Sequence, residues 1–216
     1  MKENSRVPVR VVLADDHVLV RQALKSILER EGFQVLAEAS DGQEALRHVR
    51  SLQPEILVVD ITMPVLNGLD AARELARSSP KTKIILLTQH DEEQYLSDAL
   101  ELGVKGYVLK SQAASDLIHA IREVSRGSVY LSPGVSGALL EAYRSRSDAP
   151  ANPLTPRERQ VLQLIAEGKS TKDVATVLGI SVKTAESHRT RLMQKLDIHE
   201  TASLVRYAIR RGIVSP

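Results

Sequence analysis

Five polar residues stand at the ends of short apolar segments, and together their types could do chemistry. They are Asp15, Asp16, Asp60, Thr88 and Lys110. If these segments are parallel strands, their carboxyl ends lie along one edge of a sheet, where open α/β folds bind ligands. A single acid at such a place is most often a solvated loop residue. Five polar residues at one edge indicate a common pocket.

Three carboxylates in one pocket indicate a metal site. Their charges repel one another unless a hard cation lies between them, and Mg²⁺ prefers such oxygen ligands. With the metal bound, a carboxylate can act as a nucleophile towards a phosphoryl group. Lys110 and the cation can neutralise the phosphoryl oxygens, and Thr88 can donate a hydroxyl hydrogen bond to them. The pocket therefore predicts phosphoryl chemistry.

The elements that must position this pocket follow from the spacing of apolar residues. Short β-branched runs alternate with stretches in which apolar residues recur every three or four positions, as Val20, Leu24 and Leu28 do. This alternation is typical of βα units, and it favours an α/β fold with a five-stranded, doubly wound parallel sheet. The predicted strands are Val9–Ala14, Gln34–Ala39, Ile56–Asp60, Lys83–Leu87 and Gly106–Leu109.

A connecting segment, residues 129–153, follows this first domain, residues 1–128. Its β-like start leads to a helix expected from Ser132 to about Arg146. Ser147–Pro153 has two prolines and no apolar period, so it reads as a linker.

The remaining residues, 154–216, are predicted to form an all-α domain of four helices. Glycines stand where three of these helices should end. The predicted helices are Pro156–Glu167, Thr171–Leu178, Val182–Lys195 and Thr201–Arg211.

Charge is unevenly spread along the chain. Residues 1–150 hold 18 Lys/Arg and 21 Asp/Glu, a net charge of −3, whereas residues 151–216 hold 11 and 6, a net charge of +5. A basic C-terminal part predicts that only this part meets a polyanion. The alternative is a small helical bundle with a solvated basic face.

Thr171–Lys195 has the pattern of a helix-turn-helix, in which Ser181 can cap the longer second helix. Ala185 and Leu192 share one face of that helix, and polar residues project from the other. The outward polar residues include Lys183, Glu186, Ser187 and Thr190, and the surrounding basic residues include Arg189, Arg191 and Lys195. This arrangement fits base contacts flanked by phosphate contacts.

Four motifs resemble those of the receiver domains of response regulators, over about Val7 to Arg126. They are ADDH (Ala14–His17), VVDITMP (Val58–Pro64), LLTQ (Leu86–Gln89) and GYVLKS (Gly106–Ser111). The resemblance implies a flavodoxin-like domain whose phospho-acceptor is Asp60, served by Thr88 and Lys110. It also implies a Mg²⁺ site formed by Asp15, Asp16, Asp60 and the backbone carbonyl of Thr62.

The same resemblance implies a switch pair, Thr88 and Tyr107, whose hydroxyl turns towards the phosphoryl group while the ring moves inward. Tyr107 alone could equally be a core or edge aromatic residue. Thr62 and His90 stand at positions that tune the lifetime of the phosphoryl group in this family.

The C-terminal part resembles the NarL/LuxR-type output domain through LTPRERQVLQLIAEGKS (Leu154–Ser170) and DVATVLGISVKTAESHR (Asp173–Arg189). The resemblance implies that Val182–Lys195 is the recognition helix and that the last helix contributes to dimerisation. It assigns base reading to Glu186, Ser187 and Thr190, and backbone contacts to Lys183, Thr184 and Arg189. His188 fits a half-buried structural residue better than a base reader.

Together, the two resemblances imply a response regulator of a two-component system. It would take a phosphoryl group from a sensor histidine kinase with Mg²⁺ and bind double-stranded promoter DNA as a homodimer. Its only catalysis would be phosphorylation and dephosphorylation of itself at Asp60. The unphosphorylated chain should bind DNA weakly, because the receiver shields the recognition helix or holds the output domains apart.

Two rival functions belong to other classes. A metal-dependent phosphohydrolase could use Asp60 as its nucleophile, but Thr62 stands where a second acid would serve as the general acid. A protein-interaction regulator with vestigial phosphorylation is disfavoured because all five pocket residues are present. The absence of cysteine and of any apolar run near ~18 residues favours a cytoplasmic protein without a membrane partner.

Overall fold

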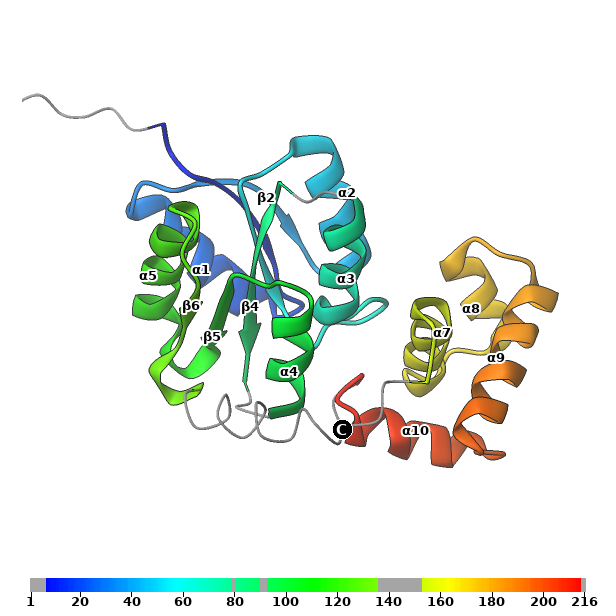
Figure 1. The fold of residues 1–216 in the computed structure, drawn as a ribbon. Helices are drawn as coiled ribbons and strands as arrows, with labels where there is room; N and C mark the ends of the chain where they lie inside the picture. Colours follow the sequence, from blue (N-terminus) through cyan, green and yellow to red (C-terminus); the bar gives the residue numbers. More distant parts are fainter. Residues whose placement is uncertain (1–6, 79–80, 90–92, 136–152, 215–216) are drawn as a thin grey trace, which may run out of the picture.

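The computed structural model describes residues 7–78, 81–89, 93–135 and 153–214, and it places an α/β domain before a helical domain (Figure 1). The predicted fold class is confirmed. None of the helices in these ranges combines the length and the apolar character that a membrane span requires.

The sheet has six described strands, all parallel, in the order β2-β1-β3-β4-β5-β6. The order of the strands reverses direction between β1 and β3, and open sheets of this kind bind ligands at such a point. Five of the strands match the predicted ones within one residue. The sixth lies in the β-like start of the connecting segment, which was not counted among the predicted strands. The strands are β1 (Arg10–Ala14), β2 (Gln34–Ala39), β3 (Ile56–Asp60), β4 (Lys83–Thr88), β5 (Gly106–Leu109) and β6 (Tyr130–Leu131).

Only the start of the helix predicted from Ser132 lies within the described residues. There, a short 3₁₀ turn, η2 (Pro133–Val135), follows the strand. The buried Ser132 hydroxyl accepts a hydrogen bond from the Leu109 N–H at 3.2 Å and donates one to Asp116 at 2.7 Å. Ser132 is therefore fixed to the edge of the sheet by these two hydrogen bonds. Most of the predicted helix and linker, residues 136–152, lie outside the described residues.

Two apolar cores lie on the two faces of the sheet. In β1, Leu13 belongs to one core and Val12 to the other, as the alternation of a strand requires. The helices α1 and α5 cover one face, and α2, α3 and α4 cover the other (Figure 1). The helices are α1 (Val18–Arg30), α2 (Gly42–Leu52), α3 (Gly68–Ser78), α4 (Glu93–Glu101) and α5 (Ala113–Ser125), with the 3₁₀ helix η1 (Lys110–Gln112) before α5.

The C-terminal domain packs its helices around a separate core that includes Leu162, Leu192 and Leu204. Thr155 and Ser170 each form a capping box, which satisfies backbone N–H groups at the helix starts. The helices, which match the predicted ones within one residue, are α7 (Pro156–Ala166), α8 (Thr171–Leu178), α9 (Val182–Leu196) and α10 (Thr201–Arg210).

Candidate functional site

The acidic pocket lies at the carboxyl ends of four adjacent strands. Asp15 follows β1, Asp60 ends β3, Thr88 ends β4 and Lys110 follows β5. Because these strands are hydrogen-bonded neighbours, their ends bring the polar residues together. A cavity of about 480 Å³ opens at this edge of the sheet, and its lining includes Asp16, Asp60 and Thr62.

Lys110 joins two of the carboxylates. Its ammonium lies 2.7 Å from Asp60 Oδ2 and 2.8 Å from Asp15 Oδ2, and all three side chains are buried. Burial raises the pKa of Asp60 to about 6, although the Lys110 cation lowers it. Burial alone would lower the pKa of Lys110, but the carboxylates outweigh it and raise this pKa. The ionised Asp60 is thus costly to bury and favours added positive charge.

The acid cluster fits a hard cation. Ligand atoms of Asp15, Asp16, His17 and Asp60 all lie within 4.8 Å of one another. Asp16 Oδ1 is buried and accepts no hydrogen bond among the described residues, although His17 Nδ1 lies 2.7 Å from it. A buried carboxylate oxygen in a cluster of acids is a suitable ligand for a hard cation.

The two residues expected to form a switch pair are both buried. Thr88 is 2% exposed, and Tyr107 is 1% exposed and packs in the core beside α4. The ring is therefore in the inward position, which suits both a core aromatic residue and the inward state of a switch. His90, expected to tune the phosphoryl lifetime, lies outside the described residues.

Gly68 is a site residue that the sequence did not reveal. A Cβ atom at this position would lie 2.1 Å from the Asp60 carbonyl oxygen. Glycine lets α3 begin directly against the end of β3, so the acceptor and the start of the helix are held together. A GLD start to a helix (Gly68–Asp70) carries no local signal of this close approach.

The exposed face of α9 carries most of the residues predicted to contact DNA. Ser181 caps the helix by accepting the Thr184 N–H at 3.1 Å, and Ala185 and Leu192 are fully buried. Because these two residues pack one face of α9 against the core of the domain, the polar residues on the opposite face point into solvent. The exposed ones are Lys183, Thr184, Glu186, Ser187, Thr190, Arg191 and Lys195, whereas His188 and Arg189 are half-buried.

Two of the basic residues on α9 have partners within their own domain. The Arg189 guanidinium donates to Thr201 Oγ1 at 2.9 Å and to Thr171 Oγ1 at 3.4 Å. Lys195 Nζ lies 2.7 Å from the Glu158 carboxylate. Both residues therefore tie α9 to other helices, a contribution that the sequence did not indicate.

Comparisons with known proteins match both parts of the chain. Residues 11–122 match the model of the response regulator receiver domain, and residues 152–208 match that of bacterial regulatory proteins of the luxR family. The transcriptional regulatory protein MctR of Rhizobium johnstonii is 40% identical over 211 residues, which cover 97% of each chain. The oxygen regulatory protein NreC of Staphylococcus carnosus is 38% identical, covering 95% of this chain and 99% of NreC.

The solved structure of RcsB from Salmonella enterica serovar Typhimurium, bound to a promoter in the presence of a phosphomimetic, has a TM-score of 0.61. It is 30% identical and covers 92% of this chain and 97% of RcsB. The chain belongs to the two-component response regulators with a LuxR-type DNA-binding domain. This response regulator thus belongs to a family of DNA-binding transcription regulators.

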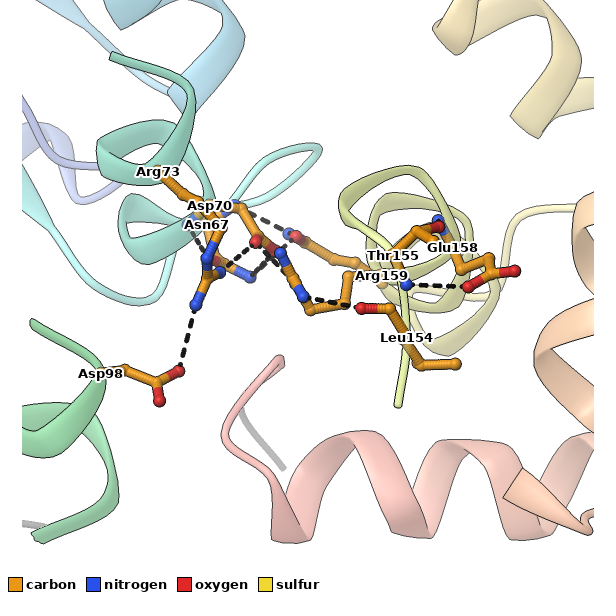
Figure 2. A network of polar contacts seen from close by, with 9 residues as sticks. Asn67, Asp70, Arg73, Asp98, Leu154, Thr155, Glu158 and Arg159 are labelled. Atoms are coloured by element: carbon orange, nitrogen blue, oxygen red, sulfur yellow. Dashed lines mark hydrogen bonds and ion pairs between the residues drawn. The ribbon is translucent and has the colours of Figure 1, made fainter. Parts of the chain in front are cut away.

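The response regulator has a contact between its two domains that sequence reasoning missed. The Nε atom of Arg159 in α7 lies 2.8 Å from Asp70 Oδ1 in α3 (Figure 2). Gln163, one turn further along α7, is fully buried against the segment that follows β3. The only sequence signal was the spacing of three polar residues, Arg159, Gln163 and Glu167, at every fourth position.

This contact leaves the recognition face of α9 uncovered. The receiver meets α7, while the outward residues of α9, among them Lys183, Glu186 and Ser187, stay exposed with both domains present. In Figure 1, α9 lies on the side of its domain away from the sheet. The expectation that the receiver shields the recognition helix is therefore not met in this structure.

Proposed function

We propose that the response regulator accepts a phosphoryl group on Asp60 from the phosphohistidine of a partner sensor kinase. A carboxylate oxygen of Asp60 forms a bond to phosphorus while the bond from phosphorus to the kinase imidazole nitrogen breaks. The nitrogen keeps the electron pair of that bond. The observation that supports this step is the buried Asp60 carboxylate, held 2.7 Å from the Lys110 ammonium.

The other pocket residues support the same transfer. Lys110 offsets negative charge at the acceptor, and the Thr88 hydroxyl lies at the end of the neighbouring strand, where it can donate to a phosphoryl oxygen. Asp15, Asp16, Asp60 and the Thr62 carbonyl would hold Mg²⁺, which supplies positive charge against the phosphoryl oxygens when bound. Attack of water on the phosphorus later restores the carboxylate and releases phosphate, so the protein resets itself.

The DNA-binding half of the proposal rests on the exposed face of α9. Glu186, Ser187 and Thr190 are placed to read base edges in the major groove, and Lys183, Thr184 and Arg191 to hold the backbone. Arg189 and Lys195 can add to the backbone contacts while they brace the helix. Phosphorylated chains bind the promoter as a dimer, with α10 contributing to the contact between copies.

The decisive experiment is the substitution Asp60→Asn. The amide is not a competent nucleophile, so labelling of the full chain by a small phosphodonor with Mg²⁺ should be abolished. Asp197→Asn is the matched control, because it makes the same change at a side chain that is 95% exposed and lies in the other domain. If Asp60→Asn is labelled as fast and as fully as the wild type, Asp60 is not the acceptor.

A further inference from the structure

The turn between β1 and α1 carries the two adjacent acids of the pocket. Asp15 and Asp16 are neighbours in the chain, so the planar peptide group between them sets how their side chains are directed relative to each other. The Asp15 N–H donates to the Ala39 carbonyl at 3.1 Å, and Asp15 Oδ1 accepts the His17 N–H at 2.9 Å. Neither of these contacts involves the carbonyl of the peptide group that joins the two acids.

That carbonyl accepts a hydrogen bond from Arg21, in the first turn of α1. The donor is Nη1 of the guanidinium, and the acceptor is the backbone oxygen of Asp15. Asp15 is fully buried, and a buried carbonyl needs a donor, which here is also charged. Arg21 therefore fixes the plane of the peptide group between the two acids.

Arg21 is itself held in place by a carboxylate of the sheet. Its side chain is 14% exposed, and its Nε lies 3.4 Å from Glu38 Oε2 in β2. This Nε is buried and forms no hydrogen bond among the described residues, so the contact with Glu38 is an ion pair. Oε1 of the same carboxylate lies 2.8 Å from Nζ of Lys25, one turn further along α1. A planar guanidinium held at two points has little freedom to turn, so Glu38 directs Arg21 towards the turn.

The two acids differ in how firmly their side chains are held. Asp15 Oδ2 lies 2.8 Å from the Lys110 ammonium. Asp16 has fewer contacts: its buried Oδ1 lies 2.7 Å from His17 Nδ1 and accepts no hydrogen bond among the described residues. A cation is bound tightly only where its ligands are already directed at one point. The direction of Asp16 therefore depends on the backbone, and above all on the peptide group that Arg21 holds.

We propose that Arg21 is a positioning residue for the Mg²⁺ site, which it prepares by fixing the peptide group between Asp15 and Asp16, and that Glu38 directs it. The inference rests on the proposed function, because it concerns the site that phosphorylation uses. The guanidinium bonds to a backbone carbonyl and not to the carboxylates. It therefore orients the acids without occupying the oxygens that bind the cation.

Charge and positioning predict opposite effects when Arg21 is replaced. By Coulomb's law alone, the loss of a positive charge near the site raises the affinity for Mg²⁺. The loss of a group that orients the ligands lowers metal affinity, by about 10–100-fold. Arg21→Met removes the charge and the hydrogen bond but keeps an apolar side chain of similar reach. The sign of the change in affinity therefore distinguishes the two effects.

The first test titrates Mg²⁺ into the full chain by calorimetry, with no phosphodonor present. Arg21→Met should weaken Mg²⁺ binding at least about tenfold. Lys25→Met is the matched control, because it removes the same charge from the same helix and the same carboxylate but makes no contact with the turn. Its affinity should be unchanged or slightly raised. Equal or tighter binding in Arg21→Met overturns the positioning role, whereas a wild-type chain that binds no Mg²⁺ overturns the proposed metal site itself.

The second test separates positioning from a general loss of structure. Labelling of Asp60 by a small phosphodonor is followed across Mg²⁺ concentrations in variants whose helix signal matches that of the wild type. In Arg21→Met, the Mg²⁺ concentration that gives half the maximal rate should rise about tenfold, and the rate at saturating Mg²⁺ should stay close to that of the wild type. A lower maximal rate with an unchanged half-saturating concentration would show that Arg21 supports only the fold. Absence of label in the wild type would instead contradict the proposed function.

Discussion

Two helices of the output domain carry polar residues at every fourth position, but one of these polar faces is buried and the other is exposed to solvent. Arg159, Gln163 and Glu167 follow one face of α7 and its C-terminal end, and Arg159 and Gln163 are buried against the receiver. Lys183, Ser187 and Arg191 follow one face of α9 and stay exposed.

The difference lies in what each polar face meets. The α7 residues meet backbone groups and a carboxylate of the receiver, so their burial is offset by hydrogen bonds and an ion pair. The α9 residues meet solvent, and the opposite face of the helix holds the domain together. A polar face on a helix is therefore an interaction surface in both cases, but for a segment of the same chain in one case and for a separate partner in the other.

The largest effect is expected from the buried face of α9. Leu192 is fully buried, so Leu192→Ala should lower the unfolding free energy of the output domain by about 2–5 kcal/mol. The neighbouring Arg191→Ala is the control, with a change within about 0.5 kcal/mol. Denaturant unfolding, followed through the helix signal, measures both. Similar losses for the two variants would mean that the apolar face does not hold α9 in place.

The next largest effect is a change in the DNA sequences that the protein prefers, and it distinguishes the polar face of α9 from that of α7. Ser187→Ala and Thr190→Ala should each change which duplexes are preferred, since a lost hydrogen bond to a base costs about 0.5–1.5 kcal/mol. Gln163→Ala removes a polar side chain from the buried polar face of α7 and should leave the preferred DNA sequences unchanged. The three variants are compared by selecting bound duplexes from a random DNA library and sequencing them. Wild-type preference in both α9 variants would refute their assignment as base readers.

The smallest effect concerns two arginines of α9. The exposed Arg191 should make a phosphate contact, so Arg191→Ala should lower the slope of log affinity against log salt by about one. The Arg189 guanidinium already donates hydrogen bonds to Thr171 and Thr201. Arg189→Ala should therefore mainly lower the unfolding free energy of the domain, by about 1 kcal/mol. Binding titrations across salt concentrations test this. A larger change in slope for Arg189→Ala would reverse the two assignments.

The pocket was predictable because its residues obey a rule of parallel sheets. Asp60, Thr88 and Lys110 each stand at the end of an apolar run, and the ends of adjacent parallel strands converge. The strand β6 and the turn after it were not predictable in the same way. Tyr130–Leu131 is too short for a periodic signal, and the buried Ser132 takes its place through bonds to residues far along the chain.

The sequence by itself determined five of the six described strands, the helices of the output domain, the residues of the pocket and the outward face of α9, because each depends on local periodicity or on strand ends. Only the tertiary structure decided that Gln163 and Arg159 are buried, that Val65 is held in a left-handed backbone and that α9 stays uncovered. The physical reason is that a polar side chain can be buried when a distant segment supplies its hydrogen-bond partners. Local spacing carries no information on which segment that is.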